Sequence, residues 1–175
     1  GTRMRSSLPK VLHPLGEKPL LMHALDTLNE LTGTPPVVVI GHGADQIKST
    51  VGDSATFVMQ AEQLGTGHAV MQAEDTLKSA ADLVLVTYGD MPLIRAESFS
   101  ALIETQQANP GPLSMISIVV DNPRGFGRVL RNEAGAVTAI IEDVDCTPEQ
   151  RKINELNVGV YCIDADWLWA ALPRI

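Results

Sequence analysis

Short apolar runs alternate with helix-periodic stretches along the chain up to Asp121, and this alternation limits the folds that it can adopt. Four runs have the length and composition of buried strands: 37–40, 56–60, 83–87 and 115–120. Three stretches have helical periodicity, and Gly33 is placed to end the first of them: 21–31, 66–80 and 97–107. Strands that alternate with such helices form right-handed crossover units around a parallel sheet. The sequence therefore predicts an α/β fold.

The pattern changes after Asp121. Three strand-like runs follow and predict a mixed or antiparallel patch: 127–131, 137–142 and 158–163. Between the last two runs, Thr147 and Gln150 match a capping box with Pro148 at the first helical position, which predicts a helix. We expect a nucleotide-binding α/β part over residues 1–121 and a smaller β-rich part over residues 122–175, within one domain.

The charge balance of the chain excludes several classes of protein. Thirteen Lys and Arg residues stand against 21 Asp and Glu residues, which gives a net charge of -8. Such a surface repels nucleic-acid backbones and anionic lipid, so we expect no nucleic-acid partner and no membrane partner. No membrane span and no secretory signal is visible in the sequence. Cys146 and Cys162 are too few for a disulfide framework and favour a cytoplasmic location, although a single bridge stays open.

The buried-looking run 83–87 leads directly into Asp90. In open α/β sheets, ligands bind at the carboxyl ends of the strands. A carboxylate placed there suits Mg²⁺ in company with a phosphate, because Mg²⁺ prefers oxygen ligands. The alternative is that Asp90 only caps the turn before Pro92. The run by itself leaves both interpretations open.

Two further loops carry residue types that suit a nucleotide. Arg3 and Lys10 place cations on a loop that begins with Gly1, and together they can hold a triphosphate, whereas singly each is a solvated surface charge. Gln60 precedes Gly65 and Thr66. An amide side chain followed by backbone that glycine leaves accessible suits hydrogen bonding to the edge of a base. The alternative for this second loop is a turn in which Thr66 caps the following helix.

Other catalytic motifs are absent from the sequence. Three Gly-x-Gly pairs lack the third glycine of a dinucleotide-binding loop, and no P-loop pattern occurs. The histidines lack the spacing of a zinc site, and we interpret most of them as surface or capping residues: His13, His23, His42 and His68. No Gly-x-Ser-x-Gly elbow is present, so nucleophilic catalysis has no support.

Seven short motifs occur in a fixed order along the chain: 1–4, 8–13, Gln60 with 65–69, 88–93, 125–128, 140–142 and 155–159. In this combination the chain closely resembles the uridylyltransferase (pyrophosphorylase) domain of bifunctional bacterial N-acetylglucosamine-1-phosphate uridylyltransferase/glucosamine-1-phosphate acetyltransferase. The resemblance covers essentially the whole chain. It implies a Rossmann-like three-layer nucleotidyltransferase fold, with a mixed, mostly parallel sheet and a small β-rich sugar-binding portion.

The resemblance also implies an activity and its partners. UTP and N-acetylglucosamine-1-phosphate would react to give UDP-N-acetylglucosamine and pyrophosphate, with Mg²⁺ as cofactor. The product is a precursor of peptidoglycan and lipopolysaccharide, and the reaction takes place in the cytoplasm.

Each matching position takes an implied role. Arg3 and Lys10 would hold the UTP phosphates, Gly1 would lie in the loop that receives them, and Asp90 would bind the metal. The uracil and its ribose would contact three residues: Gln60, Gly65 and Thr66. The N-acetylglucosamine pocket would be lined by five: Tyr88, Gly89, Gly127, Glu142 and Asn157.

The sequence departs from the family at both ends. The family's first strand precedes the position of Gly1, so we expect an apolar slot beside the central strands. The second metal ligand and the acetyltransferase β-helix of the family would lie beyond Ile175, and a homotrimer is expected only where that β-helix is present. Two alternatives stay open: another sugar-1-phosphate nucleotidylyltransferase, or a truncated, non-catalytic piece that binds nucleotide sugar.

Overall fold

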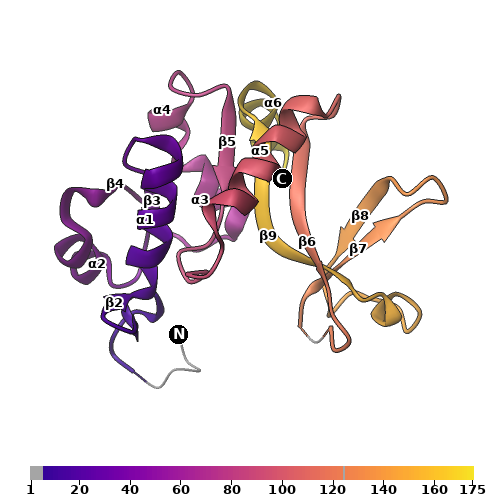
Figure 1. The fold of residues 1–175 in the computed structure, drawn as a ribbon, viewed down its shortest axis with the longest axis horizontal. Coiled ribbons are helices and arrows are strands. Elements are labelled where there is room, and N and C mark those ends of the chain that lie inside the picture. Colours follow the sequence, from indigo (N-terminus) through magenta and orange to yellow (C-terminus); the bar gives the residue numbers. More distant parts are fainter. Residues whose placement is uncertain (1–5, 124) are drawn as a thin grey trace.

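A computed structural model describes residues 6–123 and 125–175 of the chain. It shows a mixed α/β fold in which helices pack against two main sheets (Figure 1). The β7–β8 hairpin projects at one end of the molecule, and α1, α2, β3 and β4 lie at the other (Figure 1). Among the helices of the described part, none combines the length and the apolar character that a membrane crossing needs.

The first unit of the fold is held together by a cluster of buried aliphatic side chains that includes Leu21, Leu25 and Ile40. Its β3 and β4 pair in parallel, and α1 ends at Gly33, which adopts φ 67 as the left-handed C-cap that the sequence predicts. The elements of this unit are η2 (Lys10–Leu12), β1 (Pro14–Leu15), β2 (Lys18–Pro19), α1 (Leu20–Thr32), β3 (Val37–Ile40), α2 (Ala44–Val51), η3 (Gly52–Ser54) and β4 (Thr56–Met59).

The second unit is built on a five-stranded sheet with the order β5-β9-β7-β8, in which β6 also pairs with β9. The core of this sheet contains Leu156, Val160 and Cys162 of β9, which are completely buried. The elements of this unit are α3 (Thr66–Met71), α4 (Glu74–Leu77), β5 (Leu83–Val86), α5 (Ala96–Ala108), β6 (Leu113–Val119), β7 (Gly127–Arg131), β8 (Val137–Ile141), η4 (Gln150–Lys152), β9 (Glu155–Asp164), α6 (Ala165–Ala171) and η5 (Leu172–Arg174).

The expectation of a mostly parallel sheet is wrong for the described residues. The β3–β4 pair is parallel, whereas β5, β6 and β7 all pair antiparallel with β9. The reason is that β9 returns after the hairpin and inserts between β5 and β6. The apolar run of β5 correctly indicated a strand covered on both faces, but such a run carries no information about the direction of its neighbours.

Two helical predictions also need correction. The stretch 66–80 forms two short helices, because the amides of Gln72 and Ala73 bond three residues back and the helix restarts at Glu74. The capping box forms, with Thr147 N–H donating to Gln150 Oε1 over 2.9 Å and Gln150 N–H donating to Thr147 Oγ1 over 3.2 Å. It is followed by a short 3₁₀ turn rather than an α-helix. The sequence interpretation missed α2 and α6.

An apolar cavity of about 710 Å³ separates β3 from β5. Its walls include Val37 to Val39 on one strand and Leu83 to Val86 on the other, together with side chains from α1 and α3. The cavity lies where we expect an apolar slot beside the central strands. Residues of the loops after β4 and β5 form part of its lining, and they include several of the predicted site residues.

Candidate active site

Five of the predicted substrate-binding residues line the same cavity: Gln60, Gly65, Thr66, Tyr88 and Gly89. They come from the loop between β4 and α3 and from the loop that follows β5. The structure therefore brings the expected base-binding loop and the start of the expected sugar-binding loop together.

Lys10 and Asp90 form an ion pair across 80 residues of sequence. Lys10 belongs to η2, and Asp90 lies in the turn that follows β5. That turn is closed by the backbone, because Met91 N–H donates to the carbonyl oxygen of Tyr88 over 3.3 Å. Within the described residues, the Asp90 carboxylate contacts Lys10 rather than capping its own turn. The two side chains are 54% and 27% exposed, so an incoming phosphate has access to them.

Gln60 has its amide group held in place by the loop that it precedes. Its Nε2 donates to the carbonyl oxygen of Gly65 over 3.2 Å and lies 3.0 Å from Nδ1 of His68. Gln72 contacts the other ring nitrogen of His68 at 3.3 Å. His68 therefore contacts the amide of Gln60, whereas the sequence interpretation took most of the histidines as ordinary surface or capping residues.

Thr66 does not cap its helix. Gly65 takes the N-cap position of α3, and Thr66 is the first helical residue. The Thr66 hydroxyl lies instead 3.4 Å from the hydroxyl of Tyr88, so it connects the loop after β4 to the loop after β5.

Tyr88 packs directly over Gly159 in β9. A Cβ atom at Gly159 would lie 2.3 Å from Cε2 of Tyr88, and Gly159 adopts φ +76, so glycine satisfies both the contact and the backbone. The Asn157 side chain accepts two hydrogen bonds through Oδ1, from Gly159 N–H and from the Tyr161 hydroxyl, each over 2.9 Å. Burial raises the pKa of Tyr161, and the nearby Glu142 carboxylate acts in the same direction, which favours the protonated donor.

Gly127 and Asn157 are paired neighbours on β7 and β9. Glu142 follows β8, and its Oε1 would lie 3.4 Å from a Cβ atom at Gly127. The Glu142 carboxylate therefore lies close above the strand at Gly127. The structure brings together Tyr88, Gly127, Glu142 and Asn157, and it adds Tyr161 and Gly159, to which the sequence interpretation gave no role.

Gly89 lines the cavity described above but does not join the group of residues beside β9. Gly89 lies close to α1, because a Cβ atom there would be 2.8 Å from Cδ1 of Leu21, so its smallness serves packing. Gly1 and Arg3 lie outside the described residues. In the described part of the chain, no group of three or more His, Cys, Asp and Glu residues is arranged to hold a metal ion.

Comparison with known proteins places the chain in a family of nucleotidyltransferases. The model of the MobA-like NTP transferase domain matches residues 1–142. The bifunctional protein GlmU of Heliobacterium modesticaldum is 44% identical over 175 residues, and that of Pseudomonas aeruginosa PAO1 is 48% identical over 173 residues. These alignments cover 100% and 96% of this chain, but only 38% and 37% of the relatives. The chain thus spans well under half the length of the curated relatives that it matches.

Solved structures with low sequence identity share the fold. A UDP-glucose pyrophosphorylase complexed with UDP-glucose matches with a TM-score of 0.71 and 17% identity, covering 98% of this chain and 75% of its own. A CMP:2-keto-3-deoxy-manno-octonic acid synthetase complexed with CTP also gives a TM-score of 0.71, with 18% identity, and the match covers 97% of this chain and 73% of the other.

Proposed function

The chain belongs to the MobA-like NTP transferase family, and from this premise we propose that it transfers a uridylyl group from UTP to N-acetylglucosamine-1-phosphate. The products would be UDP-N-acetylglucosamine and pyrophosphate. Identities of 44% and 48% to bifunctional GlmU proteins over nearly the whole chain support this choice within the family. We further propose that residues 1–175 form part of the uridylyltransferase region, with nucleotide binding in residues 1–121 and sugar binding in residues 122–175.

One observation carries the proposal: the segment from Tyr88 to Asp90 joins two chemically different halves of the site. Asp90 pairs with Lys10, which suits a phosphate chain, whereas Tyr88 packs over β9 beside Asn157 and Glu142, which suits a hydroxylated sugar. A nucleotide sugar requires both kinds of contact a short distance apart. The loop after β5 supplies that spacing.

The residues present fit a magnesium ion. Mg²⁺ in phosphate-transfer sites is bound through one or two carboxylates together with substrate phosphates, and Asp90 offers one partly exposed carboxylate next to a cation. When bound, Mg²⁺ would supply positive charge that stabilises the developing negative charge on the pyrophosphate.

The proposed reaction needs no general base. A phosphomonoester has a second pKa of about 6, so the sugar phosphate is mostly dianionic at neutral pH. Its oxygen attacks the α-phosphorus of UTP in line, a new P–O bond forms, and the bond to the bridging oxygen breaks to release pyrophosphate. Lys10 contributes fixed positive charge beside the phosphates, and the site as a whole aligns the two reactants.

The other residues would provide recognition. Gln60 and the backbone at Gly65 would bind the uracil edge, with Thr66 near the ribose. Glu142 would accept a hydrogen bond from the sugar and Asn157 would donate one through Nδ2, because Gly159 and Tyr161 already occupy its Oδ1. We propose that the product feeds peptidoglycan and lipopolysaccharide synthesis in the cytoplasm, and that any trimer requires an acetyltransferase β-helix.

A substrate panel tests this function. Pyrophosphate release should be measured with UTP, TTP or CTP, each combined with N-acetylglucosamine-1-phosphate or glucose-1-phosphate. We expect UTP with N-acetylglucosamine-1-phosphate to be preferred by roughly 10-fold or more in kcat/KM, because a site built to bind a polar group discriminates strongly against its absence. A preference for another base or sugar would point to a related nucleotidylyltransferase, and turnover of none of the pairs would refute the proposal.

A further inference from the structure

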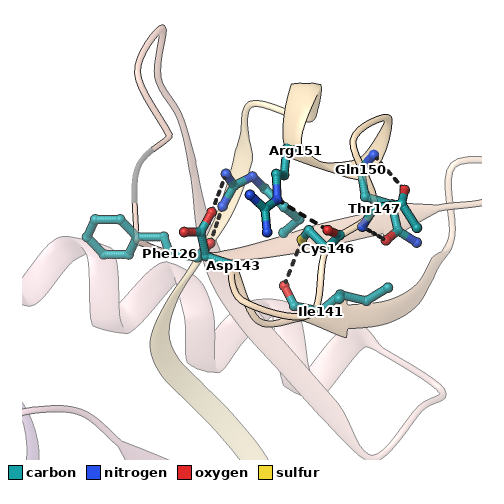
Figure 2. Close-up of polar contacts among 8 residues, drawn as sticks. Phe126, Ile141, Asp143, Cys146, Thr147, Gln150 and Arg151 are labelled. Atoms are coloured by element: carbon teal, nitrogen blue, oxygen red, sulfur yellow. Dashed lines mark hydrogen bonds and ion pairs between the residues drawn. The ribbon is translucent and has the colours of Figure 1, made fainter.

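Arg128 is a buried cation to which the proposed reaction gives no role. It lies next to Gly127 on β7, and its side chain is only 3% exposed. Arginine is rarely buried without a partner, because removing its charge from water costs free energy. Its Nη2 donates to Oδ1 of Asp143 over 2.9 Å, and its Nη1 donates to the carbonyl oxygen of Phe126. Figure 2 labels Asp143 and Phe126, the two residues that accept these hydrogen bonds.

Both chain neighbours of Glu142 are attached to Arg128. Ile141 is the register partner of Arg128 in the β7–β8 ladder, and Asp143 forms the ion pair with its side chain. The turn then closes on Glu142 itself, because Asp145 N–H donates to the Glu142 carbonyl oxygen over 2.9 Å. Arg128 thus fixes the backbone on either side of Glu142.

The far side of the same turn has separate contacts. The Cys146 thiol faces the Ile141 carbonyl oxygen at 3.7 Å, and Arg151 Nε donates to the Cys146 carbonyl oxygen over 3.2 Å (Figure 2). The capping box at Thr147 and Gln150 follows directly. With these contacts in place, loss of the Asp143 ion pair should loosen the stretch around Glu142 without unfolding the whole segment.

We propose that Arg128 is a positioning residue for the sugar half of the site. Its side chain holds Asp143 while the backbone ladder holds Ile141, and together they keep the Glu142 carboxylate above Gly127, where the carboxylate can accept a hydrogen bond from a sugar hydroxyl. The identity of that ligand rests on the proposed function. The planar guanidinium group suits the task because it contacts a carbonyl and a carboxylate in one fixed fork, which a lysine ammonium group does not reproduce.

The effect of losing this contact should be confined to one substrate. Lys10, Asp90 and Gln60 lie on other elements, and none of them contacts Arg128 in the described residues. We therefore expect Asp143→Asn and Arg128→Lys to raise KM for N-acetylglucosamine-1-phosphate roughly 10-fold or more, because small misplacements of a binding group are costly. KM for UTP should change by less than about 2-fold.

Asp145→Asn is the matched control. Asp145 has the same charge, lies in the same turn and is exposed, and it contributes a backbone N–H to the turn rather than a side-chain contact to Arg128. This variant should keep both KM values. The double variant Arg128→Lys/Asp143→Asn should raise KM for N-acetylglucosamine-1-phosphate no further than the stronger single variant does, because both changes break the same contact. Equal increases in the two KM values, or an Asp143→Asn variant that behaves like Asp145→Asn, would overturn the proposal.

Amide hydrogen exchange without any substrate separates this inference from the proposed function. Exchange of residues 142–146 should be faster in Asp143→Asn than in the wild type and unchanged in Asp145→Asn. If the wild type transfers no uridylyl group but exchange rises in Asp143→Asn, the function is refuted and the positioning role stands. If exchange in Asp143→Asn equals that of the wild type, the positioning role is refuted whatever the activity.

Discussion

At the scale of single residues, the site depends on two glycines that admit larger neighbours. At Gly159 an added Cβ atom would clash with the ring of Tyr88, and at Gly127 it would lie 3.2 Å from Ile140 Cγ2 and 3.4 Å from Oε1 of Glu142. Both glycines belong to β-strands, where a side chain would ordinarily add packing. Their small size instead lets functional side chains lie against the sheet.

We predict that Gly159→Ala weakens sugar binding as well as stability. The new methyl group would meet the Tyr88 ring at 2.3 Å and would adopt a left-handed φ of +76. Left-handed strain costs roughly 1–2 kcal/mol and overpacking a further 1–3 kcal/mol. KM for N-acetylglucosamine-1-phosphate should rise together with a fall in the free energy of unfolding.

Gly16→Ala is the control for backbone strain alone. Gly16 has φ +64, and no atom lies within 4 Å of its added Cβ position. This variant should lose stability by roughly 1–2 kcal/mol and keep its KM. Equal KM values for the two variants would show that Tyr88 is not positioned by Gly159.

At this scale, the sequence predicted residue types better than residue partners. Asp90 and Lys10 could be named because a carboxylate after a buried strand and a cation near a glycine loop are typical of phosphate sites. The roles of His68 and Tyr161 could not be derived, because each acts through a residue that only the folded chain brings near: Gln60 and Asn157. Arg128 lies within a motif used for the resemblance, but its burial is a property of the fold.

At the scale of elements, β9 connects the two parts of the second sheet. Its first half pairs with β7 and β6, and its second half pairs with β5 and β6. The β7–β9 contact covers just the register pairs of Gly127 with Asn157 and Arg128 with Leu156. The hairpin therefore needs an additional attachment, which side chains provide.

That attachment is a partly buried carboxylate between three strands. Glu155 of β9 accepts two hydrogen bonds from Arg131 of β7, over 2.8 and 2.6 Å, and one from Ser117 of β6 over 2.7 Å. The bond to Arg131 is the main cause that lowers the pKa of Glu155 from 4.5 to about 2. A carboxyl group with a lowered pKa stabilises the fold above its unfolded pKa, and this contribution is lost as the pH falls toward the folded value.

We predict that Glu155→Gln removes this pH-dependent contribution. At neutral pH, the variant should lose about 1–2 kcal/mol in free energy of unfolding, a value reduced for the partial exposure of Arg131. The difference from the wild type should shrink between pH 4.5 and about pH 2. Urea unfolding of both proteins at several pH values measures this difference in the free energy of unfolding. Glu74→Gln, which breaks the exposed pair with Lys78, should change the free energy of unfolding much less than Glu155→Gln does.

The elements themselves show what local patterns can predict. The bounds of β3 and β7 agree with the sequence prediction, because apolar runs with turn residues at both ends specify short strands. Strand direction and partner could not be predicted. The pairing of β5 with β9 joins residues about 80 positions apart, and no periodicity within either strand encodes it.

At the scale of the whole molecule, the candidate site lies where the two units meet. The first unit contributes Lys10, and the loop after β5 contributes Tyr88 and Asp90. The hairpin and the turn that follows it contribute Gly127 and Glu142. The proposed phosphate-binding pair and the proposed sugar-binding group thus come from different parts of the chain, and the division into a nucleotide-binding and a sugar-binding part stays a prediction.

The central claim is that the Lys10–Asp90 pair lies at the phosphates during uridylyl transfer. The rate of pyrophosphate release from UTP and N-acetylglucosamine-1-phosphate tests it most directly, in Asp90→Asn and in Asp26→Asn, since Asp26 forms a similar exposed pair with Lys18. We predict that Asp90→Asn lowers kcat by roughly 10²–10³-fold, as loss of one electrostatic contact at a reacting centre typically does, while Asp26→Asn leaves it unchanged. An Asp90→Asn variant with the wild-type rate would contradict the account.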